Sequence, residues 1–243
     1  MAAAASVTGV TGVTGGDAAL PTLLMFADGR FPSGGHAHSG GLEAAAALHG
    51  VADVVTLSEF LRGRLATTGR VSAAFAAAAC AAFHDSRPLS ELDSEFEART
   101  PSPVLRTVSR RLGRQLLRAG RTVWPHPRLD DPAPSADPAH GPHHPIALGT
   151  VAAAGGLGPD AAAFAAAHEA VLGPATAAVR LLGLDPFAVH AAVATLAPRI
   201  AEAAGDAART AHAAPADLPS AAAPLLEISA ECHATWEVRL FAS

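Results

Sequence analysis

The chain has 243 residues, of which 50% are hydrophobic but only 5% aromatic, and its net charge is -5. Much of the hydrophobic content is alanine, which favours helices over strands, so we expect an all-α protein, one irregular single-domain bundle of about eight to ten helices. The negative charge argues against general nucleic-acid binding.

The cysteines and the N-terminal sequence give evidence on the cellular compartment of the protein. Cys80 and Cys232 form no recognisable pair, which indicates a reduced, cytoplasmic protein. No basic residue precedes Arg30, which argues against a secretory signal, and no uncharged apolar run approaches the ~18 residues of a membrane span. Residues 1–19 are mostly Ala, Val, Thr and Gly and could not supply a core, so we expect a disordered leader before a helical domain over 20–243.

The stretch from Phe31 to Glu43 contains four glycines, a proline, two histidines and a glutamate. Such a composition predicts a shaped loop after a short apolar helix at 20–27, with Glu43 in the first turn of the next helix. Its residues allow three interpretations: a phosphate cradle, a metal site on His36, His38 and Glu43, or a tight packing loop. The chain has no lysine for a phosphate loop and the ligand spacing fits no standard metal template, so the residues alone favour the packing loop.

Helical periodicity continues beyond the loop. Thr56 and Glu59 have the spacing of a capping box for one helix, and residues 71–83, apolar nearly all round, predict a separate buried helix. The helices expected in this half cover residues 43–48, 56–65, 71–83, 90–98 and 104–118.

The last of these helices carries an arginine at every fourth position, Arg106, Arg110, Arg114 and Arg118. Apolar residues repeat at the same spacing, so the two sets form separate stripes. A solvated face is the commoner explanation of the arginine row, and an acidic protein partner is the second.

Residues 124–145 contain seven prolines and predict a long exposed linker between two helical halves. The linker also holds four histidines, and a histidine-rich tract can bind metal. Because no carboxylate or thiol stands at a fixed spacing from them, we expect no specific metal site. The four are His126, His140, His143 and His144.

Helices resume at Ile146. Glycine and proline predict a stop and a new start at Gly173-Pro174 and a further stop at Gly183. Asp185 and Pro186 then open a helix to about Ala204. After a polar connection, a last helix over 221–233 leads to a tail whose Trp, Arg, Leu and Phe are costly to leave in water, so residues 234–243 should dock on the body or on a partner.

Several separated motifs carry a family resemblance. The pattern Phe-Pro-x-Gly-Gly-x-x-His-Ser-x-Gly-Leu-Glu, from Phe31 to Glu43, resembles the N-terminal signature of the UreF family of urease accessory proteins. Segments 109–117, 144–149 and 180–183 are similar to later family segments, and the ending from Arg239 to Ser243 is similar to the family's C-terminal signature. Together the motifs cover roughly residues 20–243.

The resemblance implies a non-enzymatic scaffold required for maturation of the urease nickel metallocentre. Members bind the accessory protein UreD, also called UreH, and the GTPase UreG, form a homodimer and help direct nickel to apo-urease. No catalytic residue is expected, because nothing in the chain assembles an active site. No tightly bound cofactor is expected either, since the complex handles the nickel.

The resemblance also assigns residues. Glu43 and Arg239 match the functional glutamate and the C-terminal arginine of the family, and His36 stands where many members have an aromatic residue. We expect the loop and the tail to lie together as one UreD-facing surface, with the arginine helix serving UreG or the dimer. The expected partner-binding residues are His36, His38, Ser39, Glu43, Arg110, Arg114, Arg239 and Phe241.

Two alternatives from other classes stay open. One is a nickel-storing or nickel-sensing protein that uses the histidines, which tight stoichiometric nickel binding by the isolated chain would favour. The other is a helical enzyme whose site lies at residues 34–43, which would require turnover by the isolated protein.

Overall fold

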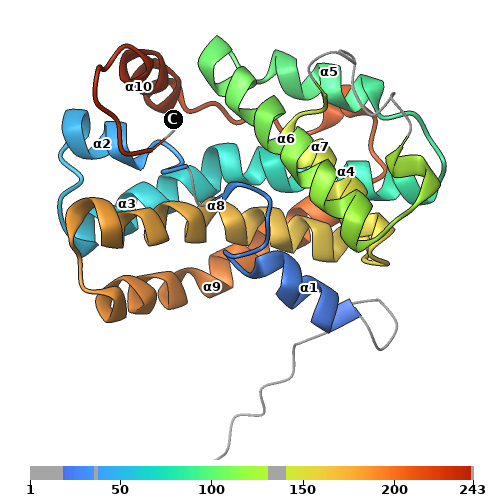
Figure 1. The fold of residues 1–243 in the computed structure, drawn as a ribbon, viewed down its shortest axis with the longest axis horizontal. Helices are drawn as coiled ribbons and strands as arrows, with labels where there is room; N and C mark the ends of the chain where they lie inside the picture. Colours follow the sequence, from blue (N-terminus) through green and yellow to red (C-terminus); the bar gives the residue numbers. More distant parts are fainter. Residues whose placement is uncertain (1–18, 36–37, 131–140, 242–243) are drawn as a thin grey trace, which may run out of the picture.

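The computed structural model describes residues 19–35, 38–130 and 141–241. Within them the chain is helical and contains no β-strand, which confirms the all-α prediction (Figure 1). Of the expected leader, residues 1–18 lie outside the described part, and Ala19 already begins the first helix. The helices are α1 (Ala19–Ala27), α2 (Leu42–His49), α3 (Val54–Arg64), α4 (Arg70–His84), α5 (Ser90–Ala98), α6 (Pro103–Val123), α7 (His144–Ala154), α8 (Pro159–Leu182), α9 (Pro186–Arg209) and α10 (Pro224–Ala234).

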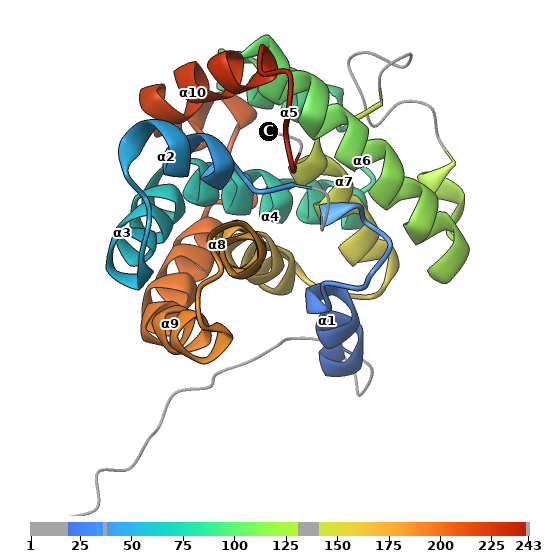
Figure 2. The same ribbon diagram turned by 60° about the vertical axis from the view of Figure 1, so that its left-hand side comes forward.

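Helix α4 forms the centre of the bundle. Figure 2 shows it in the interior, with α8 and α9 on one side and α6 and α7 on the other. All its residues from Ala73 to Phe83 are buried, as the apolar pattern predicted. The small side chains let neighbouring helices approach closely, and a methyl group on Gly149 of α7 would collide with the carbonyl oxygen of Ala76.

The predicted break between α3 and α4 is wrong. A π-helical turn, Leu65–Gly69, joins them into one helical stretch, and Gly69 keeps right-handed helical angles instead of ending the helix. The predicted capping box at Thr56 is also misplaced. Asp53 is the N-cap, its side chain accepts from the Thr56 N–H, and the Thr56 hydroxyl oxygen accepts from the Asp53 N–H.

The predicted break at Gly173-Pro174 is wrong as well, because α8 runs through both residues. Pro174 has no N–H to donate to the carbonyl of Ala170 one turn earlier. The side chain of Arg64 fills that gap, since its Nε donates to the Ala170 oxygen at 3.1 Å. The predicted stop at Gly183 and the Asp185 cap of α9 are both confirmed.

Two helices are longer than predicted, and one segment is less exposed than predicted. Helices α6 and α9 run five residues beyond their predicted ends, to Val123 and Arg209. The linker expected over 124–145 is exposed at Pro125, Pro127 and Asp130, but it is not exposed throughout, because Leu129 and His143 are fully buried. His140 of this tract lies outside the described residues.

Two helical stretches, Val54–His84 and Pro159–Leu182, are long and apolar enough to cross a membrane by length and composition. Their most apolar windows are 72% and 61% buried inside the bundle. Burial of this kind is typical of the core helices of a folded domain.

Candidate functional site

The glycine loop has the expected shape. Gly34, Gly40 and Gly41 all have positive φ angles, which a side chain would strain, and Gly41 is the N-cap of α2. Glu43 therefore falls in the first turn of α2, as predicted. The hydroxyl oxygen of Ser39 accepts from the Glu43 N–H at 3.3 Å, so the loop itself helps to orient this residue.

The carboxylate of Glu43 holds the C-terminal tail. Its Oε1 accepts from the Leu240 N–H at 2.8 Å and its Oε2 from the Phe241 N–H at 2.9 Å. Nε2 of His233, the last buried residue of α10, lies 3.1 Å from the same Oε2. We call these four residues the tail clamp. Figure 2 shows the tail descending from α10 to the loop, so the predicted proximity of loop and tail is confirmed.

The tail presents different side chains inward and outward. Phe241 is buried, and the guanidinium carbon of Arg180 lies 4.7 Å from its ring centroid. Arg239 is exposed and has no ion pair among the described residues, while Val238 and Leu240 are 83% and 69% exposed. Phe241 thus anchors the tail, and the preceding three residues face outward.

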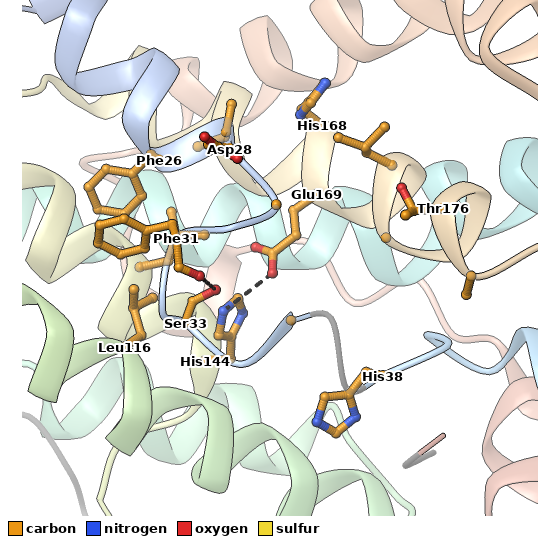
Figure 3. A pocket seen from close by; sticks show the side chains of 18 of the residues that line it. Phe26, Asp28, Phe31, Ser33, His38, Leu116, His144, His168, Glu169 and Thr176 are labelled. Atoms are coloured by element: carbon orange, nitrogen blue, oxygen red, sulfur yellow. Dashed lines mark hydrogen bonds and ion pairs between the residues drawn. The ribbon is translucent and has the colours of Figure 1, made fainter. Parts of the chain in front are cut away.

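A cavity of about 140 Å³ lies under the loop, between α1, α8 and Phe241 (Figure 3). Phe26 and Phe31 stack at one end with ring centroids 5.4 Å apart. His144 and Glu169 form a pair at 3.6 Å on its wall, and His38 also lines it. In the described part of the chain, no group of three His, Cys, Asp or Glu side chains is close enough to hold a metal ion.

The loop residues expected to bind partners point inward or are not described. Ser39 is fully buried, and His38 is nearly so, with its N–H donating to the Gly35 oxygen at 3.1 Å. Their burial favours a role in shaping the loop. His36 lies outside the described residues, and direct contact of any of the three with a partner stays a prediction.

The arginine row of α6 does not form one exposed stripe. The Arg110 side chain is only 8% exposed, and it donates to Asp93 at 3.0 Å and to Glu97. Its hydrogen bond holds the pKa of the Glu97 carboxyl below the ordinary value. As the chain is folded here, Arg110 joins α5 to α6 and is not available as a docking side chain. Arg114 is exposed, so its role in partner binding stays a prediction.

Helix α10 has its polar face inward, which the sequence reasoning missed. Ser229 and His233 are buried, and the Ser229 hydroxyl lies 2.7 Å from Nε2 of His49 on α2. On the α6 side, Glu227 accepts from the Ser102 N–H at 2.8 Å and Glu231 from the Val104 N–H at 3.1 Å. These carboxylates satisfy N–H groups at the start of α6.

The outward face of α10 is apolar. Leu225 and Ile228 are 66% and 60% exposed, and Cys232, one turn further on, is also exposed. The spacing places positions 225, 228 and 232 along one stripe of the helix, which the buried Ser229 borders on one side and the exposed Glu231 on the other. A helix with apolar side chains outward and polar ones inward is typical of an interface.

Comparisons with known proteins give the family. The UreF family model matches residues 51–197. The chain is 40% identical to a protein of Mycolicibacterium vanbaalenii described as "Urease accessory protein UreF", over 92% of this chain and 99% of the relative. It is 42% identical to a protein of the same description from Mycobacterium sp. strain JLS over the same shares, and 37% identical to one from Mycobacterium tuberculosis over 88% of this chain and 94% of the relative. With the matched motifs and the helical bundle, these similarities show that the chain belongs to the UreF family of urease accessory proteins.

Proposed function

We propose that the chain is a non-enzymatic scaffold in maturation of the urease nickel metallocentre, which bridges UreD (UreH) and the GTPase UreG during nickel delivery to apo-urease. In this proposal it acts in the cytoplasm, as a homodimer within the complex. Nickel is cargo of the assembly and is not a resident cofactor of this chain.

The tail clamp is the observation that carries the proposal. The buried Glu43 carboxylate fixes the backbone of the tail, so that Arg239 and Leu240 are held outward in one place. A tail ordered in advance loses less conformational entropy when a partner binds it. We assign this surface to UreD.

The outward face of α10 extends the same surface. His233 belongs both to α10 and to the tail clamp, so the apolar side chains Leu225 and Ile228 are rigidly connected to the tail. Arginine and large apolar side chains together are typical of the buried centre of an interface. We assign the exposed arginines of α6, such as Arg114, to UreG or to the second copy.

Co-purification tests the proposal. The tagged full chain should retain UreD and UreG from the same genome, and the chain without residues 235–243 should lose UreD. Glu43→Gln should weaken retention of UreD, while Glu202→Gln, an exposed glutamate on α9, serves as the matched control. If the full chain retained neither protein, the scaffold proposal would be wrong, and nickel titration of the isolated chain would test the storage alternative.

A further inference from the structure

Arg64 occupies a junction that the sequence reasoning did not single out. It is the last residue of α3, directly before the π-helical turn Leu65–Gly69, and that turn packs against α8. A methyl group on Gly69 would lie only 3.1 Å from the side chain of Ala170, so α8 and the turn touch at this residue. Pro174, one turn further along α8, leaves the Ala170 carbonyl without its helical donor.

The guanidinium group of Arg64 joins α8 to the glycine loop. Its Nε donates to the Ala170 oxygen. The guanidinium group also lies against Gly40, because a methyl group added to Gly40 would be 3.3 Å from the guanidinium carbon. The same methyl group would lie 2.9 Å from a ring carbon of Pro174. Gly40 therefore rests on both side chains, and its φ of +60° also favours glycine.

The charge of Arg64 persists at this half-buried position. Burial lowers the pKa of Arg64 to about 10, and the nearby negative charge of Glu169 works against that lowering, so the group is charged at neutral pH. Glu169 also pairs with His144 and lies beside Gly35 at the other end of the loop. Arg64 thus contacts the second glycine pair of the loop, at Gly40, and Glu169 lies beside the first pair, at Gly35.

We infer that Arg64 is a positioning residue for the tail clamp. It holds Gly40 against the proline-interrupted turn of α8, and Gly40 is followed by the Gly41 cap that starts α2 and places Glu43. The position of the Glu43 carboxylate relative to α8, and therefore the docked position of the tail, depends on the contact between Arg64 and Gly40. The consequence for partner binding rests on the proposed function, whereas the consequence for tail docking does not.

Amide hydrogen exchange at Leu240 and Phe241 tests the inference, because these two N–H groups report tail docking directly. Arg64→Met should raise their exchange rates roughly tenfold, because the tail should lose docking free energy equal to that of about one hydrogen bond. Arg62→Met, an exposed arginine on the same helix, should leave both rates unchanged. Unchanged rates in Arg64→Met would overturn the inference. Should that variant not fold, Arg64→Lys, which lacks the planar group, is judged by the same two amides.

Pro174→Ala separates positioning from helix repair. Alanine restores the missing N–H, so Arg64 would become dispensable if it served only α8. In the Pro174→Ala background, Arg64→Met should still raise the exchange rates at the two tail amides. If Pro174→Ala by itself left the two rates unchanged and Arg64→Met then had no effect in that background, a role in helix repair alone would be established and the positioning role refuted. Raised exchange with undiminished retention of UreD would instead contradict the proposed function and leave the positioning role intact.

Discussion

Replacing Glu43 by glutamine should release the tail while leaving the helical bundle folded. The carboxylate accepts two backbone hydrogen bonds, at 2.8 and 2.9 Å, and hydrogen bonds to a charged group contribute about 1.5–3 kcal/mol each. Glutamine keeps one oxygen and turns an NH₂ group toward the other donor. With one neutral bond of about 1 kcal/mol remaining, the tail loses roughly 2–5 kcal/mol of docking free energy.

Hydrogen exchange measured residue by residue gives that loss directly. If the tail amides exchange by local opening, the change corresponds to a roughly 30- to 4,000-fold faster exchange at Leu240 and Phe241. Amides in α4 should keep their protection, since the core does not depend on the tail. Glu202→Gln provides the control for loss of one negative charge. An increase below about threefold at the two tail amides would refute the assignment of Glu43 as the residue that holds the tail.

Three further predictions concern the bundle itself. Gly149→Ala should lower the free energy of unfolding by about 1–3 kcal/mol or more in a denaturant titration, because the methyl group meets backbone atoms of α4, whereas Gly63→Ala, with open space around it, should raise it by up to ~1 kcal/mol; equal effects would contradict the packing. Arg110→Met should lower the same quantity by about 3–5 kcal/mol, because it leaves buried carboxylate charge unpaired, and the exposed Arg111→Met should change it by less than ~0.5 kcal/mol. Burial lowers the pKa of His143 below its ordinary value of 6.5, so at lower pH the unfolded chain binds more protons than the folded chain, and the free energy of unfolding should fall as pH falls through 6.5. His143→Gln should remove this part of the pH dependence. An unchanged profile of unfolding free energy against pH would contradict the lowered pKa of His143.

The helical class and the loop were predictable because they depend on local chemistry. Alanine content sets the class, and the glycines with Pro32 exclude regular structure between Phe31 and Gly41. The cap at Asp185 and the stop at Gly183 likewise depend on a few neighbouring residues. These features are decided within one or two helical turns, which is why the sequence could predict them.

Several of the wrong predictions concern long-range partners, although the misplaced capping box at Asp53 and Thr56 is a local error. Gly173 was expected to end one helix and Pro174 to start another, but Arg64, more than a hundred positions away, satisfies the carbonyl that the proline leaves unbonded. Arg110 has the same spacing as its exposed neighbours, and only the position of Asp93 on α5 makes it buried. The sequence could place Glu43 at the start of a helix, but not show that its carboxylate reaches two tail amides nearly 200 residues later.

The most direct test of the central claim is a double-mutant cycle on the affinity for UreD, using Glu43→Gln and Arg239→Ala. If the buried glutamate acts by holding the exposed arginine in place, Arg239→Ala should weaken binding by at least roughly tenfold in the natural background and by less than about threefold in the Glu43→Gln background. Equal losses in both backgrounds would show that the two residues act independently. That result, or binding unaffected by either change, would contradict the account of a docking surface built by the tail clamp.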